Sequence, residues 1–395
     1  MLNHVCDEYG SLSLVSGTRL KRFPTNYLPP MTNTTEHQSF LDALAVRKGW
    51  VNDYLDQDSR KTLFVPQDIH DGVLSYLQAS GKVLRPCVLY FSCGAVGGKE
   101  SIATPAAVAI ELFHTWTIVH DDIMDRDTMR RGTRTVHEEF RQRALGTKVF
   151  DEREASHYGL SIGIMTGEVQ HGWAISLLSE LYDADLGNSE MVIELIRYLE
   201  TEVLLALVGG QALDIQYAKT PMENLDENTI LDMFWRKTGV LYEFAGAAGA
   251  MIGLNTPDRS HTMVRAISSF TGQCGVAFQL KDDMLGLTAD EATLGKPVCS
   301  DLREGKRTVL LIHAYHQASV TEKRFILNVI GNPGATDEQL GKVRELILAQ
   351  GSLDHAHLLM EKHVAEAIRH LEVIPDSRYK RYLVNWAEYL IGRSF

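Results

Sequence analysis

The stretch IATPAAVAIELFHTWTIVHDDIMD, residues 102–125, decides the fold because it joins a long apolar segment to a cluster of three carboxylates. The chain has no proline between residues 105 and 221. Proline disrupts a helix interior by about 3 kcal/mol, so a proline-free stretch of this length permits long helices. The sequence therefore predicts an apolar helix that ends on Asp121 and Asp122, with Asp125 following them.

The same pattern continues through most of the chain. Apolar residues recur every three to four positions, for example at Leu231, Phe234, Leu241 and Phe244, which is the period of a helix with one buried face. Alternating strand patterns are almost absent, so we predict an all-α fold in one domain. The predicted helices cover residues 36–57, 66–79, 84–97, 102–122, 153–182, 189–217, 226–253, 257–287, 306–317, 321–331, 336–350, 352–372 and 376–392.

Composition excludes several classes of protein. The chain has 395 residues, of which 45% are hydrophobic and 23% charged, and its net charge is −12. Such an acidic chain repels nucleic-acid phosphate, so we expect no nucleic-acid binding. Its five cysteines form no C-x-x-C pair, which favours a reducing, cytoplasmic environment. No uninterrupted apolar run reaches the roughly 18–20 residues of a membrane span, so we predict no transmembrane segment.

The first residues differ from the rest of the chain. Residues 1–30 carry three prolines near their end and show no helical period. Met31 directly precedes the first helical pattern. We therefore predict that residues 1–35 are either a disordered extension or a mis-annotated start, and that residues 36–395 form the folded domain.

The acidic cluster at 121–125 calls for a cation. Asp121 and Asp125 are four positions apart and share one helix face, with Asp122 beside them. Three carboxylates this close repel one another, and the negative end of the helix dipole is a poor place for anions. A solvated acidic helix end is the alternative interpretation, but the electrostatic cost favours a metal site.

A second acidic pair follows a second long apolar helix, in the stretch FQLKDD at residues 278–283. Oxygen ligands on rigid helices suit Mg²⁺, which takes one or two carboxylates and leaves its other positions to water and phosphate. Two facing acidic helix ends would hold a cluster of Mg²⁺ ions, and that cluster would hold a diphosphate.

Fixed cations occur in separated clusters. Each cluster alone is typical of surface charge, but a diphosphate needs an arginine fork and a lysine point charge together. The clusters contain Lys82 and Arg85, then Arg130 and Arg131, then Lys237, and finally Lys296, Lys306 and Arg307.

Together these residues make the chain resemble a trans-isoprenyl diphosphate synthase of the polyprenyl synthetase family, over residues 36–392. The resemblance rests on seven motifs that occur in the family's order, which coincidence does not explain. They are G-K-x-x-R-P at 81–86, H-x6-D-D-x-x-D from His114, R-R-G at 130–132, G-Q-x-x-D at 210–214, K-T at 237–238, F-Q-x-x-D-D at 278–283, and G-K followed by D-L-x-E-G-K within 295–306.

The resemblance implies an isoprenoid synthase-type bundle of long helices around a central cavity, usually as a homodimer. Such enzymes join isopentenyl diphosphate head to tail to an allylic diphosphate, which is dimethylallyl, geranyl or farnesyl diphosphate. The implied cofactor is Mg²⁺, as three ions with substrate bound. Its implied ligands are Asp121, Asp125 and Asp282, with Asp122 and Asp283 close by.

The resemblance also implies two diphosphate sites. The residues that would bind isopentenyl diphosphate are Lys82, Arg85, His114 and Arg131. Those that would hold the allylic diphosphate are Arg130, Lys237, Lys296 and Lys306. Thr238 and Gln279 would turn oxygens toward the developing allylic cation.

The expected reaction needs no side-chain nucleophile. Mg²⁺ and the basic residues neutralise the departing diphosphate so that the allylic C–O bond ionises, and a dry apolar cavity protects the cation from water. The isopentenyl double bond then attacks, and the departing diphosphate accepts the proton that is lost. Gly286 stands where the second acidic motif often has a further aspartate, its least essential carboxylate.

Two other functions share some of these features. A class I terpene cyclase also carries D-D-x-x-D, but it binds one diphosphate and has no use for the cluster of Lys82, Arg85 and Arg131. A non-catalytic subunit of a heteromeric synthase typically loses an acidic motif, whereas this chain keeps both. We therefore favour the synthase.

The product length is predicted from the helix that ends in Asp121. Trp116 lies five positions before Asp121 and Phe113 eight before it, so the two aromatic residues are neighbours on one helix face. A bulky residue at the fifth position resembles the archaeal-type geranylgeranyl diphosphate synthases. We predict that Trp116 floors the cavity and stops growth at C20. The alternatives are C15 (farnesyl diphosphate) as product, and two aromatic residues that serve only the core.

Overall fold

A computed structural model describes residues 34–78, 81–130, 132–183, 189–289 and 299–392. The predicted N-terminal extension therefore lies almost wholly outside the described residues. The described part is helical nearly throughout, and its two strands, β1 (Met129–Arg130) and β2 (Thr133–Arg134), form one short hairpin. The all-α prediction is confirmed.

The helices follow the predicted order closely. The α-helices are α1 (Thr34–Gln57), α2 (Gln67–Gln78), α3 (Leu84–Ala95), α4 (Thr104–Asp125), α5 (Val136–Gly146), α6 (Glu152–Asp183), α7 (Ser189–Tyr198), α8 (Leu204–Tyr217), α9 (Glu227–Phe234), α10 (Val240–Leu254), α11 (Thr262–Thr288), α13 (Ser300–Glu304), α14 (Val309–Gln317), α15 (Val320–Val329), α16 (Asp337–Ala349), α17 (Ser352–His370) and α18 (Arg378–Gly392). Short 3₁₀ turns are η1 (Ser59–Leu63), η2 (Glu100–Ala103), η4 (Met222–Asn224) and η6 (Leu371–Val373).

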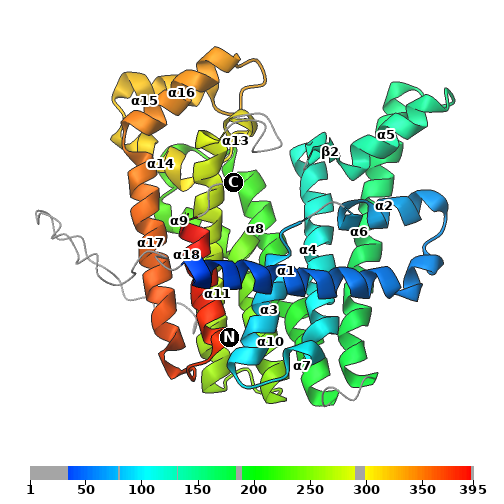
Figure 1. The fold of residues 1–395 in the computed structure, drawn as a ribbon. Coiled ribbons are helices and arrows are strands. Elements are labelled where there is room, and N and C mark those ends of the chain that lie inside the picture. The colour runs from blue at the N-terminus through cyan, green and yellow to red at the C-terminus, as the bar shows by residue number, and fades with distance from the viewer. Residues whose placement is uncertain (1–33, 79–80, 131, 184–188, 290–298, 393–395) are drawn as a thin grey trace, which may run out of the picture.

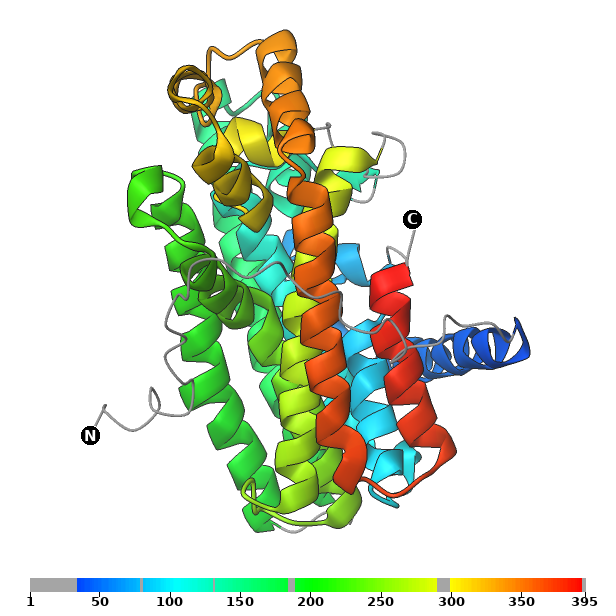
Figure 2. The same cartoon turned by 90° about the vertical axis from the view of Figure 1, so that its left-hand side faces the viewer.

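The long helices run side by side and build one bundle (Figures 1 and 2). α10 packs against both α3 and α11, α17 packs along α11, and α4 packs against α6. α1 crosses the bundle and touches α3, α4 and α18. The short helices α13 to α16 gather at one end of the bundle, and the β1–β2 hairpin that follows α4 lies at the same end (Figure 1).

Glycine lets α10 approach its two neighbours closely. A Cβ atom built on Gly249 would lie 2.2 Å from the Leu89 carbonyl oxygen of α3, and one on Gly246 would lie 2.3 Å from Thr271 Oγ1 of α11. A residue with a side chain does not fit at such a distance. α10 thereby fixes the spacing of α3 and α11, which carry the first basic motif and the second acidic motif.

Two helices that the periodicity predicts as continuous are interrupted by π turns. The predicted helix 189–217 consists of α7, the π turn η3 (Leu199–Val203) and α8. The predicted helix 226–253 consists of α9, the π turn η5 (Trp235–Gly239) and α10. A π turn keeps the chain helical with i to i+5 hydrogen bonds, so the apolar pattern continues through it and gives no sign of the change.

Besides the five-residue α13, the helix α5 is absent from the predicted set. Its buried residues Val136, Phe140 and Ala144 recur every four positions. Charged residues occupy much of the segment between them, including Glu138, Glu139 and Arg143. The short apolar period is therefore hidden by the overall polarity of the segment.

One helix within the described residues, Glu100–Asp125, is long and apolar enough to cross a membrane by length and composition alone. In the structure, 61% of the most apolar stretch of this helix is buried, because α4 packs on α3 and α6. A buried helix at the centre of a bundle has the same composition.

Replacing Gly249 by alanine should destabilise the fold by about 1–3 kcal/mol, the usual cost of overpacking, because the methyl group would overlap the Leu89 carbonyl. Gly341→Ala in α16 is the control, since its Cβ would meet nothing within 4 Å, and it should stabilise by about 1 kcal/mol through helix preference. Chemical denaturation measures both. Equal stability of Gly249→Ala and the wild type would contradict the close packing.

Candidate active site

The three carboxylates of the first acidic motif all lie inside α4, which ends at Asp125. Asp122 differs from the other two in its partners. Its oxygens accept hydrogen bonds from the Tyr76 hydroxyl on α2 and from Arg130 Nε, the latter at 2.7 Å. The side chain is fully buried, and burial, opposed by Arg130, raises the pKa of Asp122 to about 6. Asp122 is thus engaged with the protein itself.

Asp121 and Asp125 each meet a lysine from a distant part of the chain. Lys237 Nζ, on the π turn η5, lies 3.2 Å from Asp121 Oδ1 and 2.7 Å from Asp214 Oδ2 on α8. Lys306 Nζ, which follows α13, lies 2.6 Å from Asp125 Oδ2. The fold therefore brings α4, α8, η5 and the segment after α13 to one charged cluster.

Burial and charge oppose each other within this cluster. Burial raises the pKa of Asp121, but Lys237 and Lys306 overcome that effect and hold the pKa below its usual value. For Asp125, burial and the neighbouring Asp121 carboxylate raise the pKa despite Lys306. The two acids can stay ionised together only while cations lie beside them. The lysines provide those cations in this structure.

The second acidic motif is joined to the π turn η5 by hydrogen bonds. Thr238 Oγ1 donates to Gln279 Oε1 at 2.8 Å, and Gln279 Nε2 donates to Asp283 Oδ1 at 2.9 Å. The other oxygen of Asp283 is buried with no hydrogen-bond partner among the described residues. Burial, followed by the Asp301 carboxylate, raises the pKa of Asp283 to about 8. Asp282, the adjacent residue of α11, is half-buried.

Arg85 and His114, two residues of separate motifs, lie together. Arg85 Nη1 is 3.0 Å from His114 Nε2, and the guanidinium carbon lies 4.4 Å from the centre of the Tyr242 ring on α10. Arginine can only donate, so His114 Nε2 accepts and the imidazole is neutral.

Lys82 is exposed just before α3. Val83 beside it has a φ of 51°, a left-handed conformation that is costly for a β-branched residue.

Two predicted diphosphate ligands, Arg131 and Lys296, lie outside the described residues. Arg130 is described, and its guanidinium is fixed by Asp122 and by Asp127, whose Oδ2 lies 3.1 Å from Arg130 Nη2. The hairpin that carries Arg130 thus rests on the end of α4.

Trp116 and Phe113 contact each other, as the helical spacing predicts, with ring centres 4.9 Å apart. Both also contact His171 of α6, at 4.9 Å from Trp116 and 5.5 Å from Phe113. His171 Nε2 lies 3.0 Å from Glu200 Oε1 in the π turn η3. The predicted pair is therefore part of a larger aromatic cluster that joins α4 to α6.

Several residues of these networks have no role in the sequence prediction, among them Asp214, Tyr76 and His171. Asp214 ends the G-Q-x-x-D motif at 210–214, so its place in that motif is a signal that could have identified it. Tyr76 and His171 belong to none of the seven motifs. They reach Asp122 and Trp116 because α6 packs against α4 and α2 packs against α6.

Magnesium is compatible with this donor set. Within the described part of the chain, no three His, Cys, Asp or Glu side chains are placed to hold a metal by themselves. Mg²⁺ needs only one or two protein carboxylates when phosphate and water supply its other ligands. Asp121 and Asp125 hold ammonium groups, so their oxygens already occupy positions that suit cations.

Comparison with known proteins agrees with this geometry. A sequence profile of the polyprenyl synthetase family matches residues 67–347. The geranylgeranyl diphosphate synthase of Sulfolobus acidocaldarius is 38% identical over 297 residues, which cover 75% of this chain and 81% of that protein. The geranylfarnesyl diphosphate synthase of Aeropyrum pernix is 30% identical over 332 residues, which cover 83% of this chain and 95% of that protein.

A solved structure agrees with the fold. The crystal structure of geranylgeranyl pyrophosphate synthase from Corynebacterium glutamicum, complexed with isoprenyl diphosphate and magnesium, matches with a TM-score of 0.78 at 26% identity. The match covers 89% of this chain and 99% of that chain. The profile spans most of the chain and the archaeal relatives cover three quarters of it or more, so the resemblance carried by the motifs is confirmed: the chain belongs to the polyprenyl synthetase family.

Proposed function

We propose that this chain is a short-chain trans-prenyltransferase that joins isopentenyl diphosphate to allylic diphosphates and makes geranylgeranyl diphosphate. The family and its relatives already make the chain a short-chain prenyltransferase. One observation supports a diphosphate substrate: Lys237 pairs with Asp121, and Lys306 pairs with Asp125. Both pairs are half-buried, and removing one partner of such a pair leaves an uncompensated charge. Only a ligand that brings both an anion and a cation can separate the pairs without that cost, and a diphosphate with Mg²⁺ is such a ligand.

Asp121, Asp125 and Asp282 would hold Mg²⁺, and three ions with substrate bound remains our prediction. When bound, Mg²⁺ supplies charge neutralisation to the departing diphosphate. The magnesium in the Corynebacterium synthase supports this cofactor. Asp122 would not be a ligand, because Tyr76 and Arg130 already occupy its oxygens.

Lys237 and Lys306, together with Arg130 and Lys296, would bind the allylic diphosphate. Lys237 keeps a second anchor, Asp214, at 2.7 Å. The ammonium would therefore stay aimed at the site when the Asp121 carboxylate turns to a metal ion.

Thr238 and Gln279 would face the allylic cation as the C–O bond breaks. The Thr238 hydroxyl gives its hydrogen to Gln279, so its lone pairs remain available to stabilise positive charge. Gln279 is oriented in turn by its bond to Asp283. Both groups act as fixed dipoles, and neither forms a covalent bond to the substrate.

Lys82, Arg85, His114 and Arg131 would bind isopentenyl diphosphate. His114 and Tyr242 hold the Arg85 guanidinium, whose remaining donors suit a phosphate oxygen. A terpene cyclase would have no use for this second diphosphate site. After the carbon–carbon bond forms, the departing diphosphate would accept the proton that is lost, so the reaction requires no protein base.

Asp121→Ala and Asp125→Ala should each lower turnover about a thousandfold with the fold intact. Several kcal/mol of charge stabilisation is lost with a metal ligand, and about 1.4 kcal/mol corresponds to a factor of ten. The measurement is incubation with isopentenyl diphosphate and each allylic primer, with products resolved by mass. Asp376→Ala is the control, because it removes an exposed Lys–Asp pair at 3.0 Å. Near-normal turnover of either variant would contradict the assignment, and cyclised hydrocarbon from the wild type would favour the cyclase.

Trp116 and Phe113 are proposed to set the product length, and His171 deepens this proposal. The three rings form one cluster, and His171 is braced by Glu200. Such a cluster resists displacement by a growing chain better than one indole would. Relatives include both geranylgeranyl and geranylfarnesyl diphosphate synthases, whose products differ by one C5 unit. We therefore expect a small change in the side chains that close the cavity to change the product by one C5 unit.

Trp116→Ala should lengthen the products by at least one C5 unit, because the methyl group leaves most of the indole volume empty, and Phe113→Ala added to it should lengthen them further. The product spectrum resolved by mass measures this. Trp173→Ala is the control, since it removes an indole from α6 rather than from α4, at a place where Trp173 packs on Phe64. An unchanged spectrum from an active, folded double variant would place the floor elsewhere.

We propose a homodimer formed through one apolar face. Large hydrophobic side chains are exposed on three successive helices, and exposed apolar surface that gathers into a patch typically marks an interface. The residues of this face are Leu160, Ile164 and Met165 on α6, Ile193 on α7, and Leu205, Val208 and Ile215 on α8.

Val208→Asp should shift the mass in solution from two protomers toward the single 44.2 kDa protomer, because a carboxylate at the centre of an apolar interface is costly to bury. Val149→Asp is the control, since Val149 is exposed but lies between α5 and α6, outside this face. Sedimentation velocity measures both. A wild-type protein that sediments as one protomer would exclude the dimer.

We also propose a cytoplasmic location, and one domain over residues 36–395. The four cysteines in the described part of the chain are buried and free, which suits a reducing compartment. α1 and α18, near the two ends of the described chain, contact each other, which supports a single unit.

A further inference from the structure

The π turn η5 (Trp235–Gly239) carries two residues of the proposed reaction, Lys237 and Thr238. π turns inside helices occur frequently at functional sites. Here the turn changes the direction of side chains between α9 and α10, so the aim of both residues depends on how firmly the turn is held.

Neighbouring helices hold the turn by close backbone packing on two sides. A Cβ atom on Gly210 of α8 would lie 2.5 Å from the Lys237 backbone nitrogen, and one on Gly275 of α11 would lie 2.7 Å from Gly239 Cα. The turn therefore packs against these two helices with no free space between the backbones. The remaining direction in which the turn could shift is along its own helix.

A side-chain hydrogen bond spans the turn in that direction. Trp235 Nε1, on the first residue of the turn, donates to Glu243 Oε2 on α10 at 2.8 Å. The two residues are eight positions apart, which corresponds to about 12 Å along a regular α-helix. The bond therefore ties one end of the π turn to the first turn of α10. The Glu243 carboxylate also has no free space on its α11 side, since a Cβ atom built on Gly272 would lie 2.9 Å from Glu243 Oε2.

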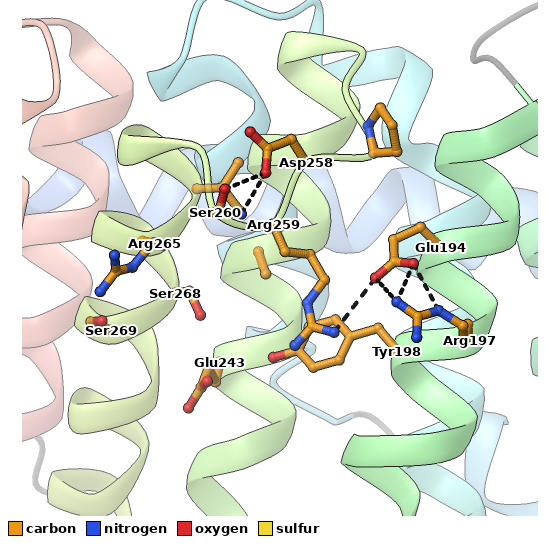
Figure 3. A pocket seen from close by; sticks show the side chains of 13 residues that line it. Glu194, Arg197, Tyr198, Glu243, Asp258, Arg259, Ser260, Arg265, Ser268 and Ser269 are labelled. Atoms are coloured by element: carbon orange, nitrogen blue, oxygen red, sulfur yellow. Dashed lines mark hydrogen bonds and ion pairs between the residues drawn. The ribbon is translucent and has the colours of Figure 1, made fainter. Parts of the chain in front are cut away.

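Nothing in the proposed reaction uses Glu243, and it does not belong to the charged cluster around Asp121. It lines the inner side of a pocket of about 610 Å³ that opens between α7, α10 and the start of α11 (Figure 3). Arg259, which also lines that pocket, bonds to Glu202 at 2.6 Å and lies over the Tyr198 ring. Burying a carboxylate is costly unless it is hydrogen-bonded, so the bond from Trp235 helps to keep Glu243 in place, together with Ser268 and the positive charge of Arg259.

We propose that Trp235 and Glu243 are positioning residues, which fix the π turn through their hydrogen bond and thereby aim Lys237 and Thr238 at the allylic diphosphate. This inference rests on the proposed function of Lys237 and Thr238. A misplacement of about 1 Å at a catalytic group can cost a hundredfold in rate, so loss of one bond distant from the substrate can affect the reaction.

The test uses variants that remove the bond and keep the packing. Trp235→Phe removes the indole N–H, Glu243→Leu removes the acceptor, and Glu243→Gln keeps an acceptor oxygen. Trp235→Phe and Glu243→Leu should lower kcat/KM for the allylic diphosphate about tenfold and leave KM for isopentenyl diphosphate within about twofold, because Lys82 and Arg85 lie at α3. Glu243→Gln should stay near the wild type, and the Trp235→Phe/Glu243→Leu pair should lose no more than either single variant.

Trp173→Phe is the matched control. Trp173 Nε1 donates to Asp58 Oδ2 at the same distance, 2.8 Å, but joins α6 to η1 rather than to the π turn. It should cost stability, measured by denaturation, without changing either kinetic constant. Calorimetry with inorganic diphosphate and Mg²⁺ gives a second readout, in which Trp235→Phe should bind about tenfold more weakly than wild type, and Trp173→Phe should bind as wild type does.

The proposal would be overturned by a Trp235→Phe variant that keeps wild-type kinetics and diphosphate affinity. Equal losses of kcat/KM for both substrates in Trp235→Phe and Trp173→Phe would also overturn it, because a general loss of stability would then explain the result. A wild-type enzyme that forms no prenyl diphosphate would remove the proposed function instead, and the calorimetric comparison would still decide whether the bond positions the lysine.

Discussion

The charge balance at the end of α4 is the constraint on which the rest of the structure depends. Asp121, Asp122 and Asp125 crowd three carboxylates onto a helix end where the backbone dipole is already negative. Each acid is compensated by a cation from a different part of the chain: Arg130 at Asp122, Lys237 at Asp121, and Lys306 at Asp125. The β1–β2 hairpin, the π turn η5 and the segment after α13 must therefore converge on α4. The close glycine contacts of α10 and η5 make that convergence possible, because they bring the carrying helices within reach.

Much of the fold could be predicted from the sequence, because long helices depend on local features. The absence of proline and the regular apolar spacing predict α4 and α6 to within three residues at both ends, and the apolar spacing predicts the C-terminal ends of α10 and α11 to within one residue. The motifs also predict pairs that the structure brings together, such as Arg85 with His114 and Thr238 with Gln279. These pairs are predictable because the resemblance relates each motif to a shared ligand.

Most of the features that the sequence does not predict depend on three-dimensional packing. The π turns leave the apolar period unchanged, so periodicity cannot reveal them. Tyr76 lies 46 positions before Asp122, and it becomes a partner only because α2 packs on α6, which packs on α4. The same holds for His171 beside Trp116. Spacing alone groups Asp122 with Asp121 and Asp125, whereas the structure separates it from them by its partners.

That separation gives the three acids different capacities to change partners. Asp122 receives hydrogen bonds from Tyr76 and from a guanidinium that is itself fixed by Asp127, so replacing its partners would disrupt the hairpin. Asp121 and Asp125 meet single ammonium groups at the ends of flexible lysine side chains, and an ammonium is a point charge without a fixed fork geometry. In the proposed function, each lysine would exchange its carboxylate for a phosphate oxygen by a small rotation, while the carboxylate would accept a metal ion. The same four charges can thus be balanced in two arrangements, one with the protein alone and one around a metal-bound diphosphate. An arginine in place of Lys237 would bind the Asp121 carboxylate through its fixed fork of donors. That pair would be harder to separate when a metal-bound diphosphate arrives.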